Sequence, residues 1–291
     1  MTKRVGVIAV DSTVQNAGAV TWWRLCGDVD VQRLFRAWDA RGWSVDDLPT
    51  QPSNTSTLRR VLRDQFGGPR CLIQSLNGSA YAVVDVAVVS TDTSARQIAD
   101  AEYTTRFKIR LDEIDELLES DGLASSELAH LQTEYDRARN TYEASTLSGW
   151  LVGQVEQRKA IRLRDTGGIY FVPEGYVDSW RAFGEVIAEA SASRVYEVPA
   201  VKNEQAVVAL VEALSQELHA RVAGLDQDID ERGVRGLRSK AVRCEELAGK
   251  VRVYEALFST KLDALTDLIS RLNGRIVQAV LVAEAEAADG N

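Results

Sequence analysis

Apolar residues recur every three or four positions over most of the C-terminal third of the chain. The first run passes through Val207, Val211, Leu214, Leu218, Val222, Leu225 and Ile229, and a second continues from Val251 to Val280. A mean step of about 3.7 residues is that of a nearly straight amphipathic α-helix. We predict two long antiparallel helices joined by a corner at Gly233 and Gly236. The second would cover 237–285 if it is continuous, and Gly249 and Gly274 are the positions where it could bend. Apolar stripes this long must pack against each other or against a second copy of the chain.

A third helix is predicted over 125–164. Five residues in its first half follow the narrow spacing of a coiled-coil stripe, namely Leu128, Leu131, Tyr135, Ala138 and Tyr142. We expect this helix to join the other two in a coiled-coil-like bundle. The acidic run over 112–121 is interpreted as the solvated start of this helical segment, because negative charge is favourable near a helix N-terminus.

A strand, a helix and a second strand are predicted between residues 166 and 200. Gly167 and Gly168 precede the apolar run 169–172, and both this run and Val195–Val198 end at a proline that leads into a helix. Such a βαβ unit favours parallel strands with a right-handed crossover. The pattern leaves open whether these strands join an N-terminal sheet or form a sheet of their own.

The same stretch resembles a known group of proteins. The sequence Gly-Gly-Ile-Tyr-Phe-Val-Pro at 167–173, a helix, and Arg-Val-Tyr-Glu-Val-Pro at 194–199 are similar to an uncharacterised family carried by phages and prokaryotic genomes. The resemblance covers roughly residues 165–230 and implies a mobile-element context. That family has no assigned activity, so the resemblance implies no catalytic or binding residue.

The first 110 residues are predicted to form a mixed module of strands and helices. Strands over 4–10 and 20–25 would form a hairpin that turns at 16–18, and a further hairpin would turn at Asn77 and Gly78. A helix with Val31, Leu34, Phe35 and Trp38 on one face, and a second capped by Thr55 or Ser56, lie between them. The predicted fold class is therefore α+β. Its segments are a module at 1–110, a long helical segment at 111–165, the βαβ unit at 166–200 and a helical hairpin at 201–291.

Composition narrows the class of protein. A formal net charge of −9 argues against a general coat for duplex DNA, which needs clustered cations. Three widely spaced cysteines form neither a disulfide framework nor a zinc motif, and the apolar runs are too short to span a bilayer. We therefore expect a cytoplasmic protein with no cofactor and no metal, and no membrane partner.

Two groups of residues are candidate contact sites. One dense cationic segment lies at the predicted helical corner and could hold phosphate or an acidic partner; its members are Arg232, Arg235, Arg238, Lys240 and Arg243. The other group is the adjacent pair Trp22 and Trp23, which point to opposite faces of a strand, so that one could be an exposed stacking surface. In both cases the alternative is structural: cations paired with nearby carboxylates, and tryptophans covered by helices.

The sequence predicts a non-enzymatic interaction or scaffold protein of phage or mobile-element origin that self-associates, or holds a helical partner, through its long helices. It contains no GxxxxGK[ST], GxGxxG, GxSxG or HExxH motif, and we name no catalytic residue. One alternative is a nucleic-acid-associated protein that uses the basic corner. A further alternative is a carboxylate-dependent hydrolase, because paired carboxylates need no short motif.

Overall fold

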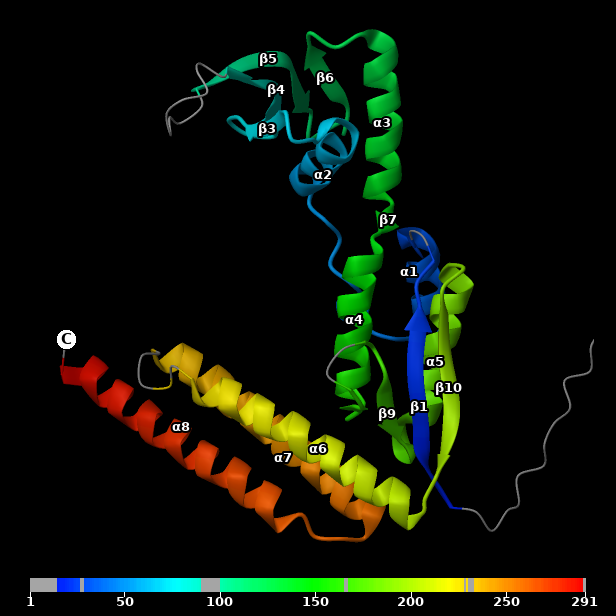
Figure 1. Cartoon of the computed structure of the whole chain (residues 1–291), viewed down its shortest axis with the longest axis vertical. Helices are drawn as coiled ribbons and strands as arrows, with labels where there is room; N and C mark the ends of the chain where they lie inside the picture. Colours follow the sequence, from blue (N-terminus) through cyan, green and yellow to red (C-terminus); the bar gives the residue numbers. More distant parts are fainter. Residues whose placement is uncertain are drawn as a thin grey trace, which may run out of the picture. The chain divides into compact units, whose positions relative to one another are not determined.

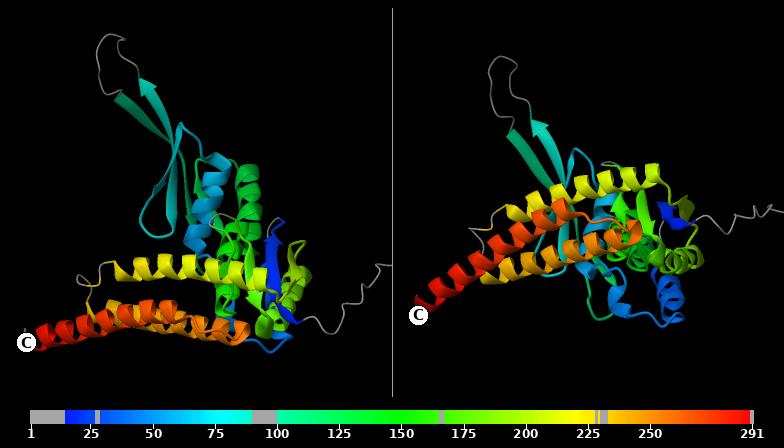
Figure 2. Two further views of the ribbon diagram at one scale, coloured as in Figure 1. Left: turned by 60° about the horizontal axis from the view of Figure 1, so that its bottom comes forward. Right: turned by 90° about the horizontal axis from the view of Figure 1, so that it is seen from below.

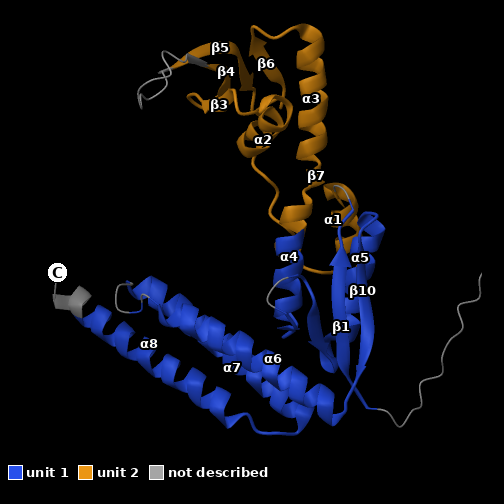
Figure 3. Cartoon of the chain, viewed as in Figure 1, with its two compact units in different colours: residues 1–26, 148–291 blue, residues 27–147 orange. Residues whose placement is uncertain are grey.

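The computed structural model describes residues 15–26, 29–89, 100–164, 167–227, 229 and 233–289. The chain divides into two compact units: residues 1–26 with 148–291, and residues 27–147 (Figure 3). This division differs from the four predicted segments. The difference arises because each predicted segment is continuous in sequence, whereas the first described strand pairs with strands from the second half of the chain.

The first unit combines a four-stranded sheet with long helices (Figure 1). Its strands, in the order β10-β1-β9-β8, all pair antiparallel with their neighbours. The strands are β1 (Asn16–Arg24), β8 (Ile161–Arg162), β9 (Tyr170–Pro173) and β10 (Arg194–Val201). The helices are α5 (Glu174–Ala190), α6 (Glu204–Asp226), α7 (Val234–Phe258), α8 (Asp263–Asp289) and most of α4 (Ala144–Gln157).

Helices cover both faces of this sheet. On one face, the indole Nε1 of Trp180 on α5 donates a hydrogen bond of 2.8 Å to Oγ1 of the buried Thr21. On the other face, Phe171 and its strand partner Val20 belong to the apolar core that α6, α7 and α8 share. Alternating residues of β1 therefore serve two cores, which explains why this strand is buried along much of its length.

The two predicted Tyr-x-Val-Pro strands do join a sheet with an N-terminal strand. β9 and β10 both run antiparallel to β1 and flank it, so they are parallel to each other, as predicted, but not adjacent. The prediction of a simple βαβ pair is therefore corrected, because β1 occupies the position between them. Trp180 and Phe183 of the intervening helix are buried, as the helical spacing predicted.

The C-terminal stripes form three helices rather than two. The predicted helix over 237–285 ends at Phe258, and Ser259 adopts a left-handed conformation with φ of 56° before α8 begins. The backbone N–H of Leu262 then donates to Oε1 of Glu255 at 2.9 Å. Phe258 and Leu262 are both buried on either side of this turn, so the apolar spacing continues across it and conceals the break. The coiled-coil character of these helices stays a prediction.

The second unit is a smaller α+β body. It contains a β2–β7 pair and a sheet of order β3-β4-β5-β6, again antiparallel. The strands are β2 (Val29–Asp30), β3 (Cys71–Ser75), β4 (Ala80–Val89), β5 (Asp100–Leu111), β6 (Leu118–Asp121) and β7 (Thr141–Tyr142). The helices are α1 (Val31–Asp39), η1 (Val45–Asp47), α2 (Asn54–Phe66) and α3 (Ser125–Arg139). Beyond its pairing with β3 and β6, the β4–β5 hairpin continues as a two-stranded ribbon (Figure 2).

The predicted helical segment over 111–165 is wrong in two places. The acidic run includes β6, which extends the sheet beside β5 rather than starting a helix. The predicted helix over 125–164 is divided into α3, β7, α4 and β8, because Thr141 and Tyr142 pair with β2 and the Tyr142 hydroxyl donates to the carbonyl of Pro49 at 2.8 Å. α3 packs with α2 and the sheet of the second unit, so it is not a third member of the C-terminal helices.

Several local predictions for the N-terminal module are confirmed. The hairpin at Asn77 and Gly78 forms, with Gly78 at φ of 68°, and α1 buries Val31, Leu34 and Trp38 although Phe35 is exposed. The second helix is capped by Ser53 rather than by Thr55 or Ser56. The predicted turn at 16–18 is part of β1 and contains an irregularity in strand pairing. The predicted strand at 4–10 lies outside the described residues.

Candidate functional site

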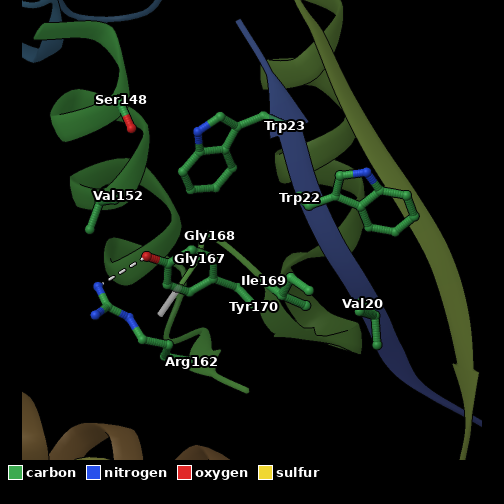
Figure 4. Close-up of a pocket in the computed structure, with 10 residues that line it drawn as sticks. All are labelled: Val20, Trp22, Trp23, Ser148, Val152, Arg162, Gly167, Gly168, Ile169 and Tyr170. Atoms are coloured by element: carbon green, nitrogen blue, oxygen red, sulfur yellow. Dashed lines mark hydrogen bonds between the residues drawn. The ribbon is translucent and has the colours of Figure 1, made fainter. Parts of the chain in front are cut away.

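An open cleft of about 700 Å³ lies beside the end of β1 in the first unit (Figure 4). Aromatic residues, glycines and an arginine gather around it. The lining residues are Val20, Trp22 and Trp23 of β1, Ser148 and Val152 of α4, Arg162 of β8, the segment 167–169, and Tyr170 of β9. Residues from four separate parts of the chain thus meet here, and this makes the cleft a product of the sheet topology.

Strand pairing positions the two aromatic side chains at the centre of the cleft. Thr21 of β1 pairs with Tyr170 of β9, and Trp23 lies two residues further along the same face of β1. The Trp23 and Tyr170 rings stack with centroids 5.4 Å apart and an interplanar angle of 8°. The β1–β9 pairing stops at Thr21 while β1 continues to Arg24 along β10, so Trp23 lies where the ladder has opened. Figure 4 shows its indole projecting toward α4.

Arg162 supplies a positive charge at the margin of the aromatic pair. Its Nη2 donates to the Tyr170 hydroxyl at 3.2 Å, and its guanidinium carbon lies 5.6 Å from the centre of the Tyr170 ring. These contacts orient the guanidinium toward the cleft wall without neutralising it. Among the described residues, no carboxylate forms an ion pair with Arg162.

A second hollow of about 350 Å³ shares Arg162 with the cleft. Arg164 lines this hollow, is exposed, and forms no ion pair within the described part of the chain. The backbone at Gly167, with φ of 87°, passes close to the Arg164 guanidinium. A Cβ added at Gly167 would lie only 3.6 Å from the guanidinium carbon. The cleft therefore combines an aromatic surface with Arg162, and the adjoining hollow adds Arg164; neither guanidinium forms an ion pair with a carboxylate of the described residues.

A buried ionic network supports the strand that carries Arg162. Glu217 of α6 accepts a hydrogen bond of 3.0 Å from the backbone N–H of Arg162 and one of 2.7 Å from Nζ of Lys250 on α7. Burial alone would raise the pKa of Glu217, but the Lys250 charge and these hydrogen bonds hold that pKa below its ordinary value. Arg221 completes the network with ion pairs to Glu217 and Glu156.

This arrangement can recognise a ligand that has both a flat surface and negative charge. Aromatic rings of tryptophan and tyrosine stack on planar groups, and arginine donors match phosphate or carboxylate oxygens. The Arg162 and Arg164 side chains can only donate hydrogen bonds, so they favour an acceptor-rich partner. These groups can therefore bind such a ligand by ring stacking and by donated hydrogen bonds.

The predicted basic corner is less concentrated than its sequence suggests. Lys240 is buried, and its Nζ donates to the carbonyls of Leu225 and Gln227 at the end of α6, where a positive charge is favourable. Arg238 forms an ion pair of 2.8 Å with Glu284. Arg235 and Arg243 are exposed on α7, while Arg232 lies outside the described residues. The described part of the corner therefore uses Lys240 as a helix-capping group.

The predicted tryptophan pair does contribute to the cleft. Both side chains are half-buried: Trp22 stacks on Tyr196 of β10 with centroids 5.6 Å apart, and Trp23 stacks on Tyr170. Sequence reasoning missed Arg162, Arg164 and Tyr170 as site residues. The available signal was a pair of arginines just before two glycines and an aromatic strand, but only the pairing of β1 with β9 brings Trp23 to that strand.

The described residues contain neither a metal-ligand cluster nor a membrane-spanning helix. Among the described residues, no three histidine, cysteine, aspartate or glutamate side chains converge as metal ligands would. In the same part of the chain, every helix is too short or too polar to cross a bilayer.

Comparison with known proteins gives one match. A family model described as "Family of unknown function (DUF6744)" matches residues 17–287. No curated protein and no solved structure matches the chain. The matched span includes the cleft, the second hollow and the helices of the first unit up to the last two residues of α8.

Proposed function

The chain belongs to the DUF6744 family, whose function is unknown, and we propose that it is a non-enzymatic interaction protein that binds an anionic partner through the aromatic cleft of its first unit. One observation carries this proposal: the stacked pair Trp23 and Tyr170 lies beside Arg162, with Arg164 close to Gly167 of the same cleft, and neither arginine side chain has a carboxylate partner among the described residues. Elsewhere in the unit, arginines such as Arg221 are paired. We also propose an origin in a phage or other mobile element, as the resemblance of residues 165–230 implies, and a cytoplasmic location, as the three widely spaced cysteines imply.

Retention on immobilised heparin, a flexible polyanion, tests this proposal. The net charge of −9 disfavours retention, so any binding at low salt has to come from a local cationic site. We expect the wild-type protein to bind and Arg164→Glu to elute at clearly lower salt. Arg162→Glu is less suitable alone because Arg162 also contacts Tyr170.

The matched control makes the same charge change at the helical corner. Arg235→Glu, on the exposed surface of α7, should leave the elution salt unchanged. Equal losses in Arg164→Glu and Arg235→Glu would show a non-specific charge effect. Loss in Arg235→Glu alone would favour the basic corner over the cleft and contradict the proposal.

Self-association through the C-terminal helices is a second candidate function. After the core between α6, α7 and α8 is formed, α8 still exposes Val277, Leu281 and Val282, with exposed fractions of 49%, 62% and 52%. Val277 and Leu281 are four residues apart and share one helix face. A second copy of the chain covering this face would remove apolar surface from water.

Size-exclusion chromatography with in-line light scattering tests this second function. A multiple of 32.0 kDa that falls to the monomer mass in Leu281→Glu would support it. The control is Thr266→Glu, an exposed position near the start of the same helix and away from this apolar face, which should keep the wild-type mass. A wild-type monomer at micromolar concentration would contradict it.

A further inference from the structure

We propose that the cleft binds a nucleobase together with its phosphate, as part of single-stranded DNA or RNA. This inference rests on the proposed function and deepens it by naming the chemical class of the anionic partner. A nucleotide unit within a strand combines the two features that the cleft offers to a ligand. Its base has a flat face, and its phosphate carries a negative charge a short distance away.

The aromatic part of the cleft provides a stacking surface for the base. Trp23 lines the cleft and is half-buried, and the nearly parallel Tyr170 ring behind it is buried and fixed by the Arg162 hydrogen bond. The Trp23 indole is therefore supported in one orientation, which reduces the entropy lost when a base stacks on it. Base stacking on aromatic side chains is tolerant of sequence, because every base has a π face.

The arginine part provides the contact for phosphate. Arg162 borders both hollows, and Arg164 lines the smaller one and lies close to Gly167, which lines the cleft. Neither forms an ion pair with a described carboxylate, whereas Arg221 in the smaller hollow is paired with Glu217 and Glu156. Phosphate oxygens would satisfy donors of Arg162 and Arg164 with the geometry that arginine favours.

A second aromatic pair favours a strand over a free nucleotide. Trp22 also lines the cleft and stacks on Tyr196, which is 38% exposed at the sheet edge. Trp22 and Trp23 project from opposite faces of β1 where its pairing with β9 has ended, so a single strand that crosses this open edge can stack one base on each. In a duplex the bases already stack on one another, so a double-stranded ligand could use only the arginines.

Fluorescence anisotropy of labelled (dT)12 and (rU)12, titrated with the full chain, tests this inference. Trp23→Leu keeps apolar bulk but removes the π face, and we expect it to weaken binding by about tenfold or more, whereas Trp23→Phe should restore most of the affinity.

The salt dependence of binding tests the phosphate contacts. Two phosphate contacts predict a slope of log K against log salt of about −1.4, and Arg164→Ala should reduce its magnitude by about 0.7. Arg235→Ala is the matched control and should change neither quantity. The melting temperature of each variant identifies any that fails to fold, and Arg164, which is exposed, provides a test that is independent of the strand core.

Comparison with dTMP, inorganic polyphosphate and heparin shows whether the cleft recognises a single strand, a free nucleotide or phosphate alone. If dTMP competes as well per site as (dT)12, the single-strand assignment is overturned. If Trp23→Leu binds the oligonucleotides as tightly as the wild type does, and also binds inorganic polyphosphate equally well, the proposed base stacking is overturned. If neither oligonucleotide binds while heparin retention still depends on Arg164, this inference fails and the proposed function stands; if heparin retention is also absent, both fail.

Discussion

Nζ of Lys250 on α7 lies 2.7 Å from Oε1 of Glu217 on α6, with side-chain exposures of only 6% and 11%. The same ammonium group donates to the carbonyl of Ala160, just before β8. Glu217 in turn accepts from the backbone N–H of Arg162. The pair therefore connects two helices to the short strand that carries an arginine of the cleft, so stability and site geometry depend on the same contacts.

Removing one partner of this pair should destabilise the protein strongly. Glu217→Gln leaves the Lys250 charge buried and without its carboxylate, at a cost of about 3–5 kcal/mol in the free energy of unfolding. Glu217→Gln combined with Lys250→Met removes the unpaired charge and should recover a large part of that loss. Urea denaturation at pH 7 measures both. Glu245→Gln breaks the exposed Arg252 pair as a control and should cost less than about 1 kcal/mol; an equal cost for Glu217→Gln would contradict this account.

Because of the Glu217 carboxylate, the stability of the fold should decrease at acidic pH. The folded state lowers the pKa of Glu217, so the unfolded state binds its proton more readily. The stability contributed by this carboxylate is present above the ordinary glutamate pKa and is lost as the pH falls through the lower folded-state pKa. We expect the melting temperature of the wild type to fall more than that of Glu217→Gln between pH 7 and pH 3.5. Parallel curves for the two proteins would show that Glu217 contributes nothing to acid sensitivity.

Gly18 should not tolerate a side chain. It adopts φ of 150°, and a Cβ there would collide with the Val172 carbonyl and lie 2.8 Å from Cζ of Phe171. Gly18→Ala should therefore lower the free energy of unfolding by about 2 kcal/mol or more, through strain and steric overlap. Gly175→Ala is the control, because Gly175 lies in α5 with open space around it, and alanine there should be neutral or stabilise by up to about 1 kcal/mol. Chemical denaturation would reveal the difference, and equal effects at the two sites would refute it.

The buried hydroxyl of Thr21 should contribute measurably to the free energy of unfolding. It donates to the carbonyl of Tyr196 and accepts from Nε1 of Trp180, each at 2.8 Å. Thr21→Val keeps the shape but leaves the buried indole N–H without an acceptor, which should cost about 1–3 kcal/mol. Thr133→Val, on the exposed surface of α3, should cost less than about 0.5 kcal/mol. If Thr21→Val unfolds at the wild-type denaturant concentration, this hydrogen bond is not part of what holds α5 on the sheet.

Local patterns predicted much of the secondary structure but not its pairing. The Asn77-Gly78 hairpin, the stripe of α1 and the buried face of α5 follow from turn chemistry and helical spacing, which act over a few residues. The breaks at Thr141 and Ser259 were missed because Tyr142 and Leu262 keep the helical apolar spacing while they belong to other structures. Periodicity records which residues are buried and not which element buries them.

The candidate site depended on a long-range contact that no local pattern contains. Trp23 and Tyr170 are each visible in the sequence as strand aromatics, but their stacking requires β1 to insert between β9 and β10. The cationic corner was visible as a dense run of charge, yet its Lys240 is engaged by the end of α6. Charge density along a sequence does not show which cations remain unneutralised after folding.

Fluorine NMR of the protein labelled with 5-fluorotryptophan tests most directly whether the cleft is the recognition site. The six tryptophans report on both units, and the Trp23 resonance is assigned by its loss in Trp23→Phe. Titration with (dT)12 should shift the Trp23 resonance progressively, while Trp38 and Trp43 of the second unit stay in place. A bound complex in which the Trp23 resonance does not move, or in which Trp38 and Trp43 move instead, would contradict the assignment of this cleft.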